Sequence, residues 1–371
     1  MSAVTRIETQ FVAADPQVVL AASTRLDSGG RLAVLPQAGA GWSAAGAGQG
    51  QARFTRSLPG ARIWLQLHAQ PADDPFAGPG TQLELKVRLE GPAAALHRAV
   101  AGRICSEFPL AAARLRAGLP ETTGGLSAHV LIAGGRGYLG RHLAGDLAAR
   151  GASVAVLSRG AEPGFPAAQY RWDGVHAGAW QAALHHELPV HLVNLAGQRV
   201  DVRPSAANIA RLASSRVDST LALANAVHSS GAQLESWVQS STTAIFGDAG
   251  NALLTESSPV PGLDDPQALA EMTGVAAAWE NAFEKGRDTG ALAQREYVLR
   301  TSLAIHPGAP LLGMLGLLAA TGAGGPMGSG RQYFSWISLG DWLALVRALL
   351  GFGVPVPAGV VHGAADALPN A

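Results

Sequence analysis

The chain has 371 residues, a mass of 37.9 kDa and a formal net charge of zero. This length suits two domains, or one domain with an appendage, and 48% hydrophobic residues can form at least one sizeable core. With 27 basic and 27 acidic residues, the chain has no overall field that would attract nucleic acid or an anionic membrane. The single cysteine, Cys105, excludes an internal disulfide and a cysteine-rich metal site. The scattered histidines predict no metal site either.

The sequence predicts neither a secretory signal nor a membrane span. Residues 1–8 contain no apolar segment of the kind that a signal peptide needs. The most apolar late run, residues 311–323, is shorter than the roughly 20 residues that cross a bilayer. We therefore expect a cytoplasmic protein with no membrane partner.

The first 119 residues predict a small α+β domain. Residues 81–90 alternate between apolar and charged side chains, which is typical of a strand with one wet face, and residues 5–13, 51–58 and 61–70 resemble it. Residues 38–50 are rich in alanine and glycine and predict a loop. Residues 92–119 predict a long helix with one apolar stripe, formed by Leu96, Val100, Ile104, Phe108, Ala112 and Leu115. The order of elements favours a sheet that curls around this helix.

Residues 120–128 are polar and rich in turn formers, and we interpret them as a linker to a second domain over 129–371. From residue 129 onward, strand and helix patterns alternate, which predicts an α/β fold: a Rossmann-type, doubly wound parallel sheet with helices on both faces. The expected strands are residues 129–133, 153–157, 190–195, 236–240 and 297–305. The expected helices are residues 139–150, 206–229 and 266–289.

A glycine-rich turn follows the first strand of this second domain. Gly134, Gly137 and Gly140 have the spacing of a dinucleotide-binding turn, and they lie between an apolar strand and an amphipathic helix. In such a turn the backbone approaches a pyrophosphate closely, and the N-terminus of the helix faces its negative charge. The alternative is a turn with a structural role alone.

The end of the second strand indicates which nicotinamide cofactor is bound. Sites for NAD usually place a carboxylate there to bind the ribose 2′-hydroxyl, whereas this chain has Ser158 and Arg159. An arginine beside a hydroxyl suits a 2′-phosphate, and Arg136 in the glycine turn adds a second positive charge. The sequence therefore favours NADP(H), with a merely solvated Arg159 as the alternative.

From residue 129 onward the chain resembles the atypical, extended short-chain dehydrogenase/reductases known as epimerase-like oxidoreductases. The resemblance covers about two thirds of the chain and is carried by GGRGYLGRHL at 134–143, VNLAG at 193–197, SSRVDST at 214–220, WVQSSTTAIFGD at 237–248, TESSP at 255–259, AWENA at 278–282, VLRTSLAIHPG at 298–308 and GAGGPMGSGRQYFSWISLGDW at 322–342. Residues 1–119 resemble, more weakly, the helix-grip fold of polyketide-cyclase/START-like domains. That resemblance implies either an apolar ligand in this first domain or a packed domain without one.

The resemblance assigns site residues by their positions in these motifs. For the cofactor, it implies that a pyrophosphate lies on the glycine turn and the adenosine phosphate on the end of the second strand, with other residues close to the ribose and nicotinamide groups; the full set is Gly134, Gly137, Tyr138, Leu139, Gly140, Ser158, Arg159, Leu195, Ala196, Gly197 and Ser240. It implies that Ser241 is the catalytic residue that binds a substrate carbonyl or hydroxyl. It also implies that Thr242, Arg331 and Gln332 border a small-molecule substrate.

The family's acid–base pair, Tyr-x-x-x-Lys, is absent. The lysine of that pair lowers the pKa of the tyrosine so that it exchanges a proton at neutral pH, but the only lysines here are Lys86 and Lys285, and neither follows a tyrosine at this spacing. Polar groups that remain are Thr242, Thr243, Asp248 and Glu280, each of which also has an ordinary structural interpretation. Arg300, on an apolar strand, needs a carboxylate partner or a bound anion.

Three functions are compatible with these residues. The first is hydride transfer between NADP(H) and a small carbonyl or alcohol, the second is a non-catalytic NADP(H)-dependent binding or sensor protein, and the third is a sugar-nucleotide epimerase. Residues 360–371 resemble the entry to a C-terminal lobe, and we expect part of that lobe to be missing and the substrate cleft to be open. The sequence leaves the substrate and the oligomeric state open.

Overall fold

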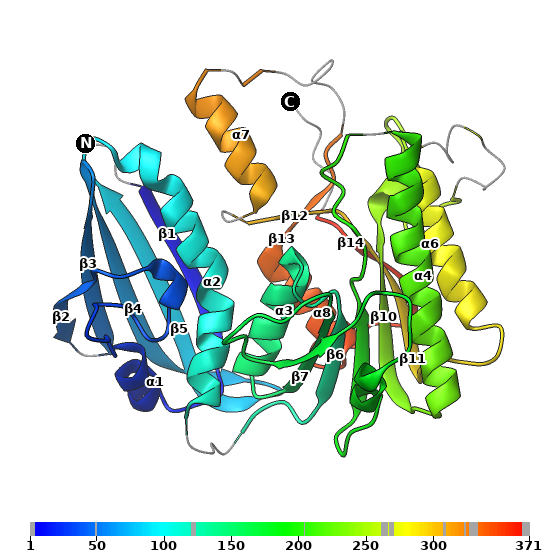
Figure 1. Cartoon of the computed structure of the whole chain (residues 1–371), viewed down its shortest axis with the longest axis horizontal. Helices are drawn as coiled ribbons and strands as arrows, with labels where there is room; N and C mark the ends of the chain where they lie inside the picture. The colour runs from blue at the N-terminus through cyan, green and yellow to red at the C-terminus, as the bar shows by residue number, and fades with distance from the viewer. Residues whose placement is uncertain are drawn as a thin grey trace.

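The computed structural model describes residues 4–48, 50–119, 124–203, 205–260, 266, 271–306, 309–322, 324–325 and 333–365. Figure 1 shows an antiparallel sheet formed by the N-terminal residues beside a larger parallel sheet that is flanked by helices. The α/β fold class is therefore confirmed, with a Rossmann-type sheet preceded by an α+β region. No described helix has the length and apolarity to cross a membrane.

The N-terminal region contains a five-stranded antiparallel sheet in the order β1-β5-β4-β3-β2. Its elements are β1 (Val4–Val12), α1 (Pro16–Ser23), η1 (Pro36–Ala38), β2 (Ser43–Gly48), β3 (Gln51–Leu58), β4 (Ala61–Asp74), β5 (Gly78–Glu90), η2 (Ala94–His97) and α2 (Arg98–Ala117). The alternation over 81–90 places Leu83, Leu85, Val87 and Leu89 in the core, none of them exposed. Helix α2 packs on this apolar face through Ile104, Cys105 and Phe108.

Two sequence predictions in this region are wrong. Residues 43–48, expected in a loop, form edge strand β2, because their backbone pairs with β3 although all six small residues are exposed. Leu96, expected in the apolar stripe of the helix, is 83% exposed because it lies in the separate 3₁₀ turn η2, out of phase with α2. The remaining apolar positions of the stripe pack against the sheet.

The second sheet has seven parallel strands in the order β14-β11-β10-β9-β6-β7-β8. Its strands are β6 (His129–Ala133), β7 (Ser153–Ser158), β8 (Ala168–Arg171), β9 (Val190–Asn194), β10 (Leu234–Thr242), β11 (Arg295–Thr301) and β14 (Gly359–Gly363). Helices α3 (Tyr138–Ala149) and α8 (Leu339–Leu349) cover one face, and α4 (Ala206–Ser230) and α6 (Met272–Gly286) the other. The strand order reverses between β6 and β9, where open α/β sheets bind ligands at the carboxyl ends of their strands.

The remaining described elements include the short helices η3 (Ala179–Leu184) and η4 (Thr243–Phe246) and helix α7 (Pro310–Ala320). A separate two-stranded sheet is formed by β12 (Leu303–Ile305) and β13 (Trp336–Ser338). The strand expected over 297–305 is therefore two strands, since β11 ends at Thr301 and β12 joins a different sheet. Within the expected helix 266–289, α6 begins only at Met272.

The two regions share a tightly packed interface in which α2 lies against α3 (Figure 1). A Cβ atom at Gly145 of α3 would lie 2.6 Å from the backbone carbon of Pro109 in α2, so the two helices approach each other more closely than any larger residue permits. Leu110 of α2 and Phe11 of β1 belong to the apolar cluster that covers the parallel sheet. The interface is therefore part of the core rather than a surface contact.

Asp146 of α3 is the polar centre of this interface. Its carboxylate accepts hydrogen bonds from Gln10 Nε2 of β1 at 2.9 Å and from Arg347 Nη1 of α8 at 2.6 Å, and Arg150 Nε lies at 3.4 Å. Burial opposes ionisation of Asp146, but Arg347 and Arg150 outweigh it and hold the pKa of this carboxyl below its usual value. Three elements of the two regions are thus joined by one buried carboxylate.

We predict that Asp146→Asn lowers the free energy of unfolding at neutral pH by about 3 kcal/mol, because it leaves Arg347 without its buried carboxylate and leaves Arg150 with Asp74 alone. Since the pKa is lowered in the folded state, the stabilisation is complete above the unfolded-state value near pH 4 and is lost as the pH falls through the folded-state pKa. Urea unfolding across this range checks the expectation, with the exposed Asp288→Asn as control. A difference in the free energy of unfolding between wild type and Asp146→Asn that stays unchanged in acid would contradict the expectation.

Candidate functional site

An open cavity of about 600 Å³ lies at the carboxyl ends of β6, β7 and β9. The glycine turn after β6 forms its floor, and the segments after β7 and β9 form its sides. The predicted cofactor residues that line it are Gly134, Gly137, Ser158, Arg159, Leu195, Ala196 and Gly197. The structure thus places these residues, which the sequence analysis assigned to one cofactor site, around one cavity.

The glycine turn is held by its own backbone. The amide of Gly134 donates to Leu157 O at 3.0 Å and the amide of Gly137 donates to Gly134 O at 2.8 Å. Gly134 has a φ of +75°, and a Cβ atom there would lie 2.7 Å from Leu195 O. Helix α3 then begins at Tyr138 with no side chain capping it, so its first amides are available to an anion.

The end of β7 forms a cationic side of the cavity. Ser158 Oγ and Arg136 Nη1 both donate to the carbonyl oxygen of Gly160, at 2.6 and 2.7 Å. Arg136 Nε is buried without a hydrogen-bond partner among the described residues, and Arg159 is exposed at the edge of the cavity. The residue types and their positions fit the 2′-phosphate of NADP(H), and the uncapped helix fits its pyrophosphate.

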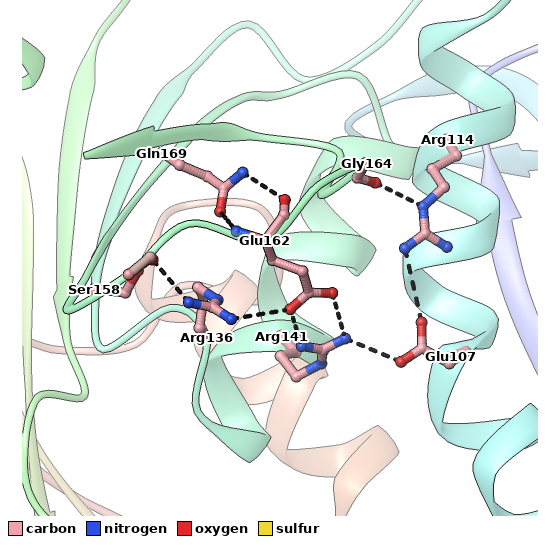
Figure 2. Close-up of polar contacts among 9 residues, drawn as sticks. Glu107, Arg114, Arg136, Arg141, Ser158, Glu162, Gly164 and Gln169 are labelled. Carbon is pink, nitrogen blue, oxygen red and sulfur yellow. Dashed lines mark hydrogen bonds and ion pairs between the residues drawn. The ribbon is translucent and has the colours of Figure 1, made fainter. Parts of the chain in front are cut away.

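A chain of alternating charges extends from Arg136 to the N-terminal region (Figure 2). Arg136 Nη2 lies 3.5 Å from Glu162, whose two carboxylate oxygens accept from Arg141 at 2.7 and 3.1 Å. Arg141 also donates to Glu107 of α2 at 2.9 Å, and Arg114 lies 3.7 Å from Glu107. Neither Glu162 nor Arg141 lines the cavity.

Ser241, the predicted catalytic residue, is the penultimate residue of β10 and is 2% exposed. Its hydroxyl donates to Glu280 Oε1 of α6 at 2.5 Å. Glu280 also accepts from Arg300 of β11 through both oxygens, at 2.9 and 2.8 Å. The sequence left open whether Arg300 pairs with a carboxylate or a bound anion, and the structure shows that it pairs with the carboxylate of Glu280. Glu280 therefore connects Arg300 to the predicted catalytic serine.

Other predicted residues lie elsewhere. Tyr138 and Leu139 pack in the apolar cluster beneath the N-terminal region, and burial raises the pKa of Tyr138. Thr242 caps η4, because its hydroxyl accepts from the amide of Ala244 at 3.2 Å. Gly140, Ser240 and Ser241 do not line the cavity. Arg331 and Gln332 lie outside the described residues.

Sequence reasoning missed His362. It lies on β14 directly beside Arg300 in the parallel register, and its ring contacts Phe246, which also lies under the guanidinium of Arg300 at 5.1 Å. Burial lowers the pKa of His362, and its Nε2 has no hydrogen-bond partner in the described part of the chain. The sequence signal that could have identified His362 is a histidine at the carboxyl end of a parallel strand.

No three of the described His, Cys, Asp and Glu residues are grouped so as to hold a metal ion.

Comparisons with known proteins agree with this geometry. The model of the NAD dependent epimerase/dehydratase family matches residues 130–280. The human epimerase family protein SDR39U1 is 28% identical over 225 residues, which are 60% of this chain and 70% of the human protein. The epimerase family protein YfhF of Bacillus subtilis is 28% identical over 240 residues, 62% of this chain and 73% of that protein.

Solved structures extend the comparison. A crystal structure of human SDR39U1 (isoform 2) with NADPH has 30% identity and a TM-score of 0.54, covering 66% of this chain and 76% of that one. A nucleoside-diphosphate sugar epimerase from Corynebacterium glutamicum, with 22% identity and a TM-score of 0.54, covers 98% of this chain and 79% of its own. At that identity the second likeness shows the fold alone, but it includes the N-terminal sheet.

The glycine turn leads to a test of stability. We predict that Gly140→Ala lowers the free energy of unfolding by about 1–3 kcal/mol, because its Cβ atom would lie 2.6 Å from Gly134 O and from Gly135 Cα, both of them backbone atoms. Gly313→Ala, in α7 where a Cβ atom meets nothing within 4 Å, is the control and should not destabilise the protein. Equal unfolding midpoints for Gly140→Ala and Gly313→Ala would contradict the close backbone contact at Gly140.

Proposed function

Because this chain belongs to the NAD-dependent epimerase/dehydratase family, we propose that it binds NADP(H) and acts as an oxidoreductase on a small carbonyl or alcohol. The observation that carries the proposal is a single cavity lined by Gly137, the residue before the uncapped helix α3, and by Ser158, Arg136 and Arg159. This arrangement offers separate positive regions to the pyrophosphate and to the 2′-phosphate.

The binding part of the proposal rests on the chain's own groups. The amides of the turn and the first turn of α3 bind the pyrophosphate, and Ser158, Arg159 and Arg136 bind the 2′-phosphate. Leu195, Ala196 and Gly197 form the opposite side of the cavity, against the ribose groups. The NADPH in the human SDR39U1 structure supports the same choice of cofactor here.

The chemical part of the proposal concerns Ser241. The bound cofactor supplies or accepts the hydride. The hydroxyl proton of Ser241 already points to Glu280, so its oxygen lone pairs are available to accept a hydrogen bond from a substrate hydroxyl. In the oxidation direction, that substrate proton passes to Ser241 as Ser241 releases its own proton to Glu280, and the reduction direction reverses these transfers. Arg300 holds Glu280 in place through two hydrogen bonds.

A second candidate is a binding protein that senses NADP(H) without turnover. The observation that favours it is that the buried Ser241 and Arg300 both hydrogen-bond to Glu280, an arrangement that a structural ion pair also has. A sugar-nucleotide epimerase is a third outcome, although the absent Tyr–Lys pair speaks against it. Oxidation of NADPH by a panel of small aldehydes and ketones separates an enzyme from a sensor.

We further propose that the N-terminal region is a helix-grip relative with no ligand of its own. Its sheet and long helix α2 support the relationship. The space between them contains aromatic and branched side chains, among them Phe54, Ile63 and Phe108, each at most 2% exposed. We therefore favour the packed alternative over an apolar ligand, and assign to this region the role of supporting α3.

The cofactor assignment is tested by titrating the protein with NADPH and NADH. We expect NADPH to bind at least about tenfold more tightly, and Arg159→Ala to weaken NADPH alone by about tenfold, because it removes one charge-assisted contact with the 2′-phosphate. Arg25→Ala, an exposed arginine of the N-terminal region that changes the net charge equally, is the control. Equal affinity of the wild-type protein for the two cofactors would refute the assignment.

The role of Ser241 is tested by Ser241→Ala. We expect kcat to fall by about 100-fold with the affinity for NADPH unchanged, because the variant loses the group that relays the proton but none of the cofactor cradle. The exposed Ser57→Ala serves as control, and Glu280→Gln should resemble Ser241→Ala in kcat. Full activity of Ser241→Ala would exclude the proposed relay.

A further inference from the structure

Glu162 is an acidic group placed beside a site that is proposed to bind a phosphate. Its position is fixed, because the side chain of Gln169 accepts from the Glu162 amide at 2.8 Å and donates to the Glu162 carbonyl oxygen at 2.9 Å (Figure 2). The carboxylate lies 3.5 Å from Arg136, the same arginine that faces the cavity. Left alone, this carboxylate would compete with a phosphate for Arg136 and repel it.

Arg141 prevents that competition. It binds both oxygens of Glu162, at 2.7 and 3.1 Å, in the two-pronged geometry that arginine and carboxylate prefer. Hydrogen bonding to Arg141 is the main reason why the pKa of Glu162 is lowered. The shorter distances therefore assign Glu162 to Arg141. Arg136 Nη1 donates to Gly160 O at 2.7 Å, but Arg136 Nη2 has only the 3.5 Å contact with Glu162.

The N-terminal region keeps Arg141 in this position. Glu107 of α2 accepts from Arg141 Nη2 at 2.9 Å, and Arg114, also of α2, donates to the carbonyl oxygen of Gly164 at 2.8 Å, two residues beyond Glu162. Arg141 and Glu107 are largely buried, with side chains 22% and 12% exposed. Helix α2 thus fixes both the arginine and the segment that carries its acidic partner.

We infer that Arg141, which lies outside the cavity, determines the preference for a 2′-phosphorylated nucleotide by neutralising Glu162 and so leaving Arg136 for the phosphate. Arg141 is a positioning residue, since it acts through Glu162 and Arg136 and touches no nucleotide. The inference rests on the proposed binding of NADP(H). It makes cofactor choice a joint property of the parallel-sheet region and of α2.

The test uses two nucleotides that differ only in the phosphate concerned, adenosine 2′,5′-bisphosphate and adenosine 5′-monophosphate, titrated calorimetrically against the intact chain. We expect Arg141→Met to weaken the bisphosphate by about tenfold and the monophosphate by less than about twofold. Arg141→Lys, which keeps the charge, should retain most of the preference. Glu162→Gln should keep or increase the preference, and the double variant Arg141→Met with Glu162→Gln should restore it.

Each outcome decides the inference. Equal weakening of both nucleotides by Arg141→Met, or a reduced preference in Glu162→Gln, would overturn it, because a merely structural role moves both affinities together. Glu162→Gln leaves the contact between Arg141 and Glu107 intact, so it remains informative if Arg141→Met does not fold. A wild-type protein with no preference for the bisphosphate would instead refute the proposed cofactor, and is thereby distinguished from failure of the inference alone.

Discussion

The contact between α2 and α3 is the constraint on which the rest of the structure depends. The two helices meet where Gly145 leaves room for the backbone at Pro109, and α3 is at the same time the helix that begins at the glycine turn. This helix of 12 residues follows Gly137, which lines the cavity, and it carries the guanidinium of Arg141 and the buried carboxylate of Asp146. The position of the proposed nucleotide site therefore depends on the N-terminal region as well as on the parallel sheet.

The two ends of the proposed site are built on different principles. At the adenosine end, Arg159 is exposed, and Arg136 is partly exposed with its Nη2 only 3.5 Å from Glu162. At the other end, Ser241 and Arg300 are buried, and both donate hydrogen bonds to Glu280, whose side chain is 16% exposed. Such a group keeps its geometry without help from a ligand.

Much of the fold follows from local sequence patterns. The alternation over 81–90 and the apolar strand before Gly134 depend on neighbours in the chain, so both could be predicted. Strand β2 could not, because glycine and alanine carry no strand signal and only pairing with β3 makes it a strand. The split after Thr301 escaped for a similar reason, since the pattern is continuous while the two halves join different sheets.

The site divides in the same way. The glycine turn and the end of β7 are close together in the sequence, and each carries a local pattern that could be read. The partner of Arg300 was only one of several possibilities, because Glu280 lies on another element and the sequence does not show which carboxylate comes near. Glu107 is further still from the cavity in the chain, and nothing in its local pattern connects it with Arg141. Contacts between distant elements carried the information that the sequence lacked.

The close packing of α2 on α3 affects how the parallel-sheet region behaves when it is produced alone. A fragment that begins after residue 124 would lose α2 and β1, and with them the surfaces that cover Leu143 and Leu147 of α3. It would also expose Arg141 and Asp146 to water without Glu107 and Gln10. Such a fragment would be prone to aggregation, so a failed expression of the isolated nucleotide-binding region would reflect an uncovered core and would not argue against its function.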